Sequence, residues 1–234
     1  MNLEVMKYIK EAGIIIRDNL FPLFIPIIIR MLFLIPQKTA GQPNISLFIS
    51  MILLLIIYPL VYGQYVEIIL NKKEIAYLEI FKTHWLNFFV VSILVGLPAL
   101  ILSTLAAIII KDSATIEYII WLLMSGVTLY IFPLVFLIRK RLESVILGLK
   151  CLFGNFSFSL PVLLLSLVPS ILALLTDQPL EKAGYSFDSV FNFIFLFFSV
   201  FIDFLTFITA TLILNDKLSK QLKDESQVDP FPAG

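Results

Sequence analysis

The chain of 234 residues is too apolar and too poor in charge for an ordinary soluble domain, with 59% hydrophobic residues, 15% charged residues and a mean hydropathy of +0.98. Soluble domains contain roughly 45–50% apolar and about a quarter charged residues. Because one soluble core cannot bury this excess, we expect lipid to be the solvent, which excludes a secreted, nucleic-acid-binding or ordinary cytosolic protein. The 17 basic and 17 acidic residues cancel, so no net charge would attract nucleic acid.

Six apolar stretches predict an all-α integral membrane bundle of six transmembrane helices. They are residues 20–36, 45–70, 88–110, 116–138, 156–175 and 190–214. The third and fourth reach the length of about 20 residues that crosses the hydrocarbon core. The first is shorter and contains Arg30, so we expect it to be tilted or only partly inserted. The stretches are continuous rather than alternating, which favours helices over a barrel.

The positions of lysine and arginine predict the orientation. Most of the 17 basic residues precede the first stretch or follow an even-numbered one, while the opposite connections hold only Lys38, Lys111 and Lys182. The positive-inside rule therefore places both termini in the cytoplasm. We expect residues 215–234 to form a polar cytoplasmic tail that is disordered and available to anionic lipid or a partner.

The sequence also repeats itself. Lys-Thr-His-Trp-Leu-Asn-Phe at 82–88 resembles Lys-Cys-Leu-Phe-Gly-Asn-Phe at 150–156, and the same step backwards leads from Asn87 to Asn19. Tyr-Pro-Leu-Val-Tyr at 58–62 resembles Phe-Pro-Leu-Val-Phe at 132–136. We therefore predict a single membrane domain built from three units, each an amphipathic helix followed by a transmembrane hairpin. The domain covers residues 1–214, with units of about 4–70, 71–138 and 139–214.

Each unit begins with an apolar stripe at helical spacing opposite a basic face. This pattern favours a helix lying in the lipid headgroup layer, the alternative being a cytoplasmic connection that packs on the bundle. Asn19, Asn87 and Asn155 stand just before the odd-numbered stretches, where an asparagine can cap unsatisfied backbone N–H groups. Capping is preferred over substrate binding for all three. The repeated prolines predict a static bend, rather than a gate, within two of the spans.

These features resemble the YciC-type six-span inner-membrane proteins and, more loosely, the membrane domain attached to some glycerophosphodiester phosphodiesterases. The resemblance is carried by the amphipathic start at 8–21, the charged link at 139–143, the Leu-Lys-x-x-Phe-x-Asn pattern at 149–155 and the polar exit after the last stretch. It implies a six-helix bacterial inner-membrane protein and transfers no catalytic residues. The hydrolase domain of the looser relative is not expected here, so phosphodiesterase activity is not carried over.

Two charges fall inside predicted spans. Arg30 and Asp203 both lie about ten residues from the cytoplasmic ends of their spans, a depth of roughly 15 Å. Because such charges are costly in lipid, we hypothesise an Arg30–Asp203 ion pair that closes the bundle. A structural lock, or an Arg30 that snorkels to the interface, is preferred over a polar site for an ion, proton or anionic substrate.

The other polar residues of the spans have ordinary explanations. We expect Glu67 to reach the interface and meet Lys72 or Lys73. For Asn192, Thr206, Thr209 and Thr211 one hypothesis is that they face a cavity, but serine and threonine in spans usually bond their own backbone or join helices. The single histidine and the single cysteine, His84 and Cys151, occupy equivalent places in two units rather than forming a dyad.

No catalytic motif is present: the sequence has no HExxH, no P-loop and no GxSxG elbow. We therefore predict no enzyme and no catalytic, cofactor-binding or metal-binding residues. The preferred function is a scaffold or accessory factor in envelope or lipid-related processes, in contact with the bilayer and with other membrane proteins or a second copy. A small transporter or permease subunit with a polar site near Arg30 and Asp203 is the alternative. An unrecognised membrane enzyme is the third hypothesis.

Overall fold

The computed structural model describes residues 3–34, 45–71, 75–109, 113–154, 156–182 and 189–227. Every regular element in these ranges is a helix, which confirms the predicted all-α class. The helices are α1 (Leu3–Asp18), α2 (Phe21–Leu34), α3 (Ile45–Asn71), α4 (Tyr77–Ile109), α5 (Ser113–Thr128), α6 (Ile131–Ile138), α7 (Arg141–Gly154), α8 (Phe156–Lys182) and α9 (Ser189–Gln227).

Three of the described helices are long and apolar enough to cross a membrane. The segments are Ile52–Asn71 in α3, Tyr77–Ala106 in α4 and Ile194–Leu218 in α9. Two bent pairs raise the number to five if each pair is one span: α1 with α2, bent by 82°, and α7 with α8, bent by 108°. Length and composition therefore support a membrane-embedded protein with three to five candidate spans.

The predicted fourth span is interrupted. It is divided between α5 and α6 by a turn at Leu129 and Tyr130, four and three residues before Pro133. A proline has no N–H for the carbonyl four residues earlier, and its ring collides with that carbonyl. The equivalent Pro59 leaves α3 continuous. Just before the break, the Thr128 hydroxyl donates to the carbonyls of Met124 and Ser125.

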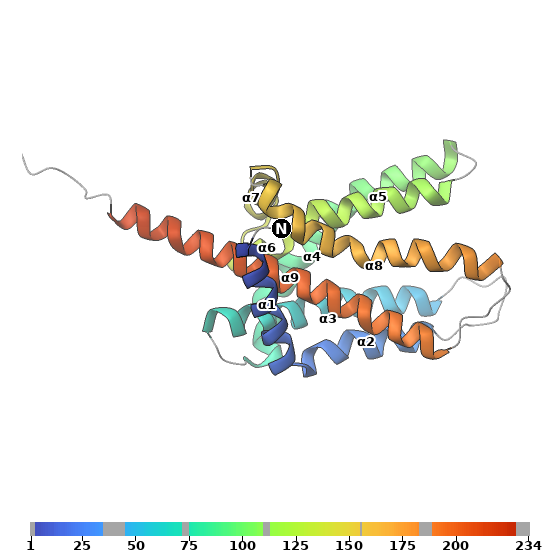
Figure 1. The fold of residues 1–234 in the computed structure, drawn as a ribbon, viewed down its shortest axis with the longest axis horizontal. Helices are drawn as coiled ribbons and strands as arrows, with labels where there is room; N and C mark the ends of the chain where they lie inside the picture. Colours follow the sequence, from blue (N-terminus) through green and yellow to red (C-terminus); the bar gives the residue numbers. More distant parts are fainter. Residues whose placement is uncertain are drawn as a thin grey trace, which may run out of the picture.

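The long helices lie alongside one another, and α1 and α7 cross one end of them (Figure 1). Helix α9 is the central element: 72% of its apolar segment is buried, against 28% for that of α4. Its neighbour α1 buries the stripe of Val5, Ala12 and Ile16 against the bundle. Since α9 remains helical through Gln227, the predicted disordered tail begins instead as a continuation of the last helix. There, the Tyr8 hydroxyl of α1 donates to Asp216 over 2.7 Å.

The leading helix of the second unit is not separate from its span. Helix α4 is continuous from Tyr77 to Ile109, whereas α1 and α7 each end before the helix that follows. Pro22 stands in the first turn of α2, where proline favours a helix start, and Gly154 ends α7. The corresponding residues 83–88 contain neither glycine nor proline, so nothing interrupts the helix.

Two features show where the molecule is exposed and where it is tightly packed. The outer face of α4 presents large apolar side chains that are about half exposed or more. They are Leu94, Leu97, Ile101, Leu105, Ile108 and Ile109. Such a continuous apolar face is typical of a surface turned to lipid or to another protein. In contrast, Gly148 of α7 lies so close to α6 that an added Cβ would meet Ile131 Cα at 2.9 Å.

Candidate functional site

A buried charged cluster joins α3, α4 and the link between α6 and α7. The Glu67 side chain is only 7% exposed, and its Oε1 lies 3.4 Å from His84 Nε2 and 3.4 Å from Arg139 Nη2. The Asn71 amide, one turn further along α3, donates to Glu67 Oε2. Because a carboxylate only accepts hydrogen bonds, the hydrogen of the His84 contact is on Nε2. One carboxylate therefore gathers donors from three parts of the chain.

The position of Glu67 differs from the sequence-based interpretation. It was expected at the interface beside Lys72 or Lys73, which lie outside the described residues, but the structure buries it. Helix α4 and the α6–α7 link cover the last turn of α3, so the carboxylate faces protein instead of the headgroup layer. The available signal was that Glu67 is the one acidic residue in the second apolar stretch.

Arg139 holds its place through an unusual backbone conformation. Its φ of 57° is the only positive value at a non-glycine residue in the described part of the chain. This left-handed residue ends α6, and its N–H donates to the Val135 carbonyl over 3.2 Å. The conformation costs roughly 1–2 kcal/mol, which the surrounding contacts must offset. It turns the chain sharply into α7 and brings the guanidinium of Arg139 to Glu67.

Asn87 secures the same link. Its amide nitrogen donates to the Arg139 carbonyl over 3.1 Å, and its oxygen accepts from Arg141 Nε over 2.9 Å. The predicted cap is not found here, because Asn87 lies in the interior of the continuous helix α4 and not at its start. Its side chain instead joins α4 to the basic link.

The other two repeated asparagines have different outcomes. Asn19 stands between α1 and α2, and its amide donates to the Ile15 carbonyl over 3.0 Å. Its own carbonyl accepts from the Tyr65 hydroxyl over 2.8 Å. The side-chain amide thus completes the end of α1 by donating to a carbonyl there, which differs from the predicted cap for the N–H groups of α2. Asn155 lies outside the described residues.

His84 and Cys151 have different surroundings in the fold. The His84 ring is 1% exposed and packs against Phe136, with centroids 5.1 Å apart. The Nδ1 atom of His84 and the Oε1 atom of Gln64, which lies three residues before Glu67 in α3, are buried with no hydrogen-bond partner among the described residues. Cys151 of α7 is half-buried, and burial raises the pKa of its thiol, although Lys217 acts in the opposite direction. No direct contact between the two is part of the described structure.

A second polar feature surrounds Asp203. This half-buried residue of α9 lines a cavity of about 240 Å³. Hydroxyl groups from four helices share the lining, and they belong to Tyr62, Ser125, Thr128, Ser166 and Thr206. The remaining lining is Leu129, Phe132, Pro133 and Phe207, so the cavity lies against the break between α5 and α6. A carboxylate and several hydroxyls are thus brought to one hollow.

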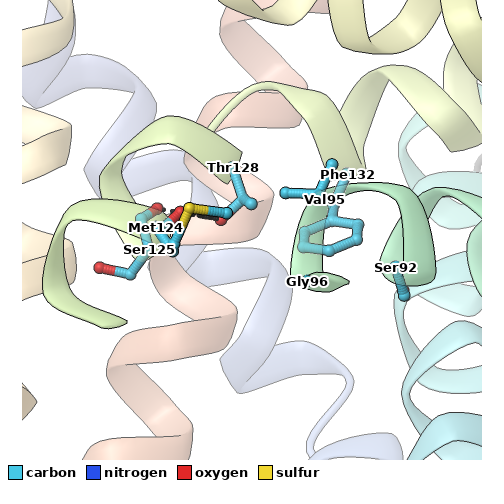
Figure 2. Close-up of a pocket in the computed structure, with 7 residues that line it drawn as sticks. All are labelled: Ser92, Val95, Gly96, Met124, Ser125, Thr128 and Phe132. Atoms are coloured by element: carbon cyan, nitrogen blue, oxygen red, sulfur yellow. Dashed lines mark hydrogen bonds between the residues drawn. The ribbon is translucent and has the colours of Figure 1, made fainter. Parts of the chain in front are cut away.

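A neighbouring hollow of about 260 Å³ lies between α4 and α5. Figure 2 shows Ser92, Val95 and Gly96 of α4 on one side and Met124, Ser125 and Thr128 of α5 on the other. Ser125, Thr128 and Phe132 line both hollows. The surface next to the helix break is therefore hollowed on two sides.

The hypothesised ion pair cannot be placed. Arg30 lies in α2, but its side chain is outside the described residues, as is the Asn192 side chain of α9. Asp203 makes contacts within the fold. The pair with Arg30 therefore stays a prediction.

The threonines of α9 divide into two kinds. Thr209 donates to the Leu205 carbonyl over 2.6 Å and Thr211 to the Phe207 carbonyl over 2.8 Å, as expected for threonines in spans. Thr206 is also buried, at 6% exposure, yet its hydroxyl has no hydrogen-bond partner in the described structure. The sequence pattern gave no sign of this difference.

Within the described ranges, no group of three or more histidine, cysteine, aspartate or glutamate residues could hold a metal ion. The arrangement therefore consists of one buried ion cluster and one hollow lined by a carboxylate and hydroxyls. Comparisons with known proteins found no matching family model, no matching curated protein and no matching solved structure.

Proposed function

We propose that this protein is a membrane-embedded scaffold or accessory factor in envelope or lipid-related processes, without catalytic activity. The observation that carries the proposal is the Glu67 cluster. It joins α3, α4 and the α6–α7 link through contacts to the buried Glu67 carboxylate, which favours a rigid body that presents surfaces over a bundle that opens. The exposed apolar face of α4 supplies such a surface.

The proposal includes the six-span, three-unit organisation in a bacterial inner membrane, with membership of the YciC-type proteins. The bent pairs α1–α2 and α7–α8 support an amphipathic helix followed by a span in two of the units. The contact of Tyr8 with Asp216 brings α1 and the end of α9 to the same end of the bundle, as expected for termini on one side. Protease treatment of spheroplasts that carry a tag at each end of the chain tests this orientation. We expect both tags to be protected until the membrane is opened. Cleavage of only one tag in intact spheroplasts would contradict it.

Photo-crosslinking in native membranes tests the scaffold function directly. A benzoyl-phenylalanine residue at Leu97 or Leu105 of the exposed α4 face is expected to capture a discrete protein partner, identified by mass spectrometry. Leu134, which is 1% exposed, is the matched control and should capture only its own chain. Adducts with lipid alone at every exposed position would overturn the scaffold proposal.

A second candidate is a small transporter, favoured by the hollow at Asp203. Asp203 lies in the candidate span of α9 and shares its hollow with five hydroxyl-bearing residues from four helices, and a charge within a span is costly unless it has a role. Flux of labelled cations into proteoliposomes tests it. Uptake that the wild type supports and Asp203→Asn abolishes would favour transport, and wild-type uptake equal to that of empty liposomes would exclude it.

A further inference from the structure

Helix α7 exposes an apolar stripe that the bundle does not cover. One line of its residues packs against the other helices, and it consists of Ser144, Gly148 and Leu152. A second line stays open, because Leu142, Ile146 and Phe153 are 62%, 46% and 67% exposed. Successive residues of a helix turn by about 100°, so these three fall within about 40° of one another. Helix α7 thus has one face covered by protein and a separate apolar face that is free.

Helix α1 differs from α7 in this respect. Its own stripe of Val5, Ala12 and Ile16 is fully buried against the bundle. In the described part of α1, Ile14 is the only large apolar side chain that is exposed. The sequence predicts the headgroup layer for both helices, but of the two only α7 keeps a stripe of apolar surface for lipid.

The charges beside the stripe favour an anionic partner. The one acidic residue of α7, Glu143, pairs with Lys140 at 2.8 Å. Arg141 and Lys150 are exposed and have no acidic partner among the described residues. Lys150 also lies one turn from Ile146, so its ammonium can reach the headgroups while its stem lies along the stripe. The charge left over on α7 is therefore positive.

Arg141 is held in a way that suits a phosphate. Its Nε donates to the Asn87 oxygen of α4 over 2.9 Å, and its two terminal nitrogens have no acceptor in the part of the chain that the structure describes. These terminal N–H groups lie in one plane and match two oxygens of a phosphate. The contact with Asn87 also restricts the side chain beforehand, which lowers the entropy that binding costs.

The direction of α7 brings the stripe and the cations to the depth of the headgroups. The axes of α7 and α8 change direction by 108° where the two helices meet. Because the proposed function places α8 across the bilayer, α7 runs nearly parallel to the membrane surface at one end of the bundle (Figure 1). An amphipathic helix in this position buries its apolar side chains about 5–10 Å into the boundary between headgroups and acyl chains.

We propose that α7 binds anionic phospholipids. Arg141 contacts the phosphate of one headgroup, and Lys150 attracts a second one further along the helix. Leu142, Ile146 and Phe153 lie among the acyl chains. This inference rests on the membrane location in the proposed function, and it adds the lipid class that the protein recognises.

Native mass spectrometry of the purified full chain in detergent, with phosphatidylglycerol or phosphatidylcholine added, tests the proposal. We expect the wild type to retain phosphatidylglycerol more strongly, and salt to weaken this preference. Arg141→Gln should weaken the apparent affinity for phosphatidylglycerol at least about tenfold, because it removes a charge-assisted contact. Lys150→Gln should weaken it about fivefold. Arg141→Lys keeps the charge but not the planar set of donors, so its affinity should fall between those of the wild type and Arg141→Gln.

Two controls separate this site from general attraction of anions. Lys10→Gln removes an exposed cation from α1, which lacks the apolar stripe, and should leave the affinity unchanged. Inorganic phosphate should not displace the lipid, because it has no acyl chain to contact the stripe. Equal retention of the two lipids, an equal loss in Lys10→Gln and Arg141→Gln, or displacement by inorganic phosphate overturns the proposal. Capture of a partner from Leu97 or Leu105 does not depend on these results, so failure here leaves the scaffold function to its own test.

Discussion

Neutralising Glu67 should destabilise the bundle far more than neutralising an exposed glutamate. Glu67→Gln keeps the shape of the side chain but removes the charge that faces His84 and Arg139 at 3.4 Å each. Two unit charges at that separation attract with about 5 kcal/mol at an effective dielectric constant of about 20. This is an upper bound, because the desolvation of the buried groups opposes it.

The net loss follows from the contacts themselves. Hydrogen bonds to a charged group contribute roughly 1.5–3 kcal/mol and neutral ones about 0.5–1.5 kcal/mol, so each converted contact loses about 1 kcal/mol. The contacts from His84 and Asn71 count in full, while that from Arg139 is discounted because its side chain is 54% exposed. We expect Glu67→Gln to lower the free energy of unfolding by about 2 kcal/mol and Glu67→Ala by about 3–5 kcal/mol.

Reversible unfolding of the purified protein in mixed micelles measures these values. The matched control is Glu143→Gln, since Glu143 pairs with Lys140 at 2.8 Å but the two side chains are 56% and 62% exposed. Such a pair contributes about 0–1 kcal/mol. If Glu67→Gln costs no more than Glu143→Gln, the buried cluster does not hold the helices together and the reasoning is wrong.

Four further substitutions test the packing and the helix break. Gly148→Ala should lower the free energy of unfolding by roughly 1–3 kcal/mol, because the added Cβ would collide with α6. Gly13→Ala is the control: its Cβ would meet nothing within 4 Å, so it should be neutral or stabilise by up to about 1 kcal/mol. The same unfolding assay measures both. Tyr8→Phe should lose about 1 kcal/mol with its 2.7 Å hydrogen bond to α9, and an unchanged midpoint would contradict that contact. Pro133→Ala restores an amide donor and should straighten the break between α5 and α6. A longer distance between spin labels on exposed positions of α5 and α7 would show this. An unchanged distance would mean that the residues before the proline cause the break.

Much of the fold could be predicted because composition and periodicity act locally. The second apolar stretch, 45–70, begins where α3 begins and ends one residue before it. The fifth stretch and α8 both begin at Phe156. The break before Pro133 could not be predicted from the repeated pentapeptide alone. The equivalent Pro59 lies within the continuous helix α3, so the pentapeptide by itself does not decide whether a helix breaks.

The candidate site was harder to predict because it is made by tertiary contacts. Glu67 and His84 lie 17 residues apart on different helices, and Arg139, which is 72 residues beyond Glu67 and has a left-handed backbone conformation, contacts the same carboxylate. In the same way, three threonines of α9 look equivalent in sequence, and only the neighbouring helices distinguish Thr206. A repeat likewise indicates where asparagines recur but not which groups they will bond, as Asn19 and Asn87 show.

The packing of α1 against the last turns of α9 has a consequence for synthesis. The apolar stripe of α1 is synthesised well before the part of α9 near Leu212 and Asp216 that lies against α1. Until α9 is made, the stripe lacks part of its native cover, and the headgroup layer is the medium that suits its amphipathic form. A nascent polypeptide cut short before residue 212 would therefore leave α1 without its α9 neighbour.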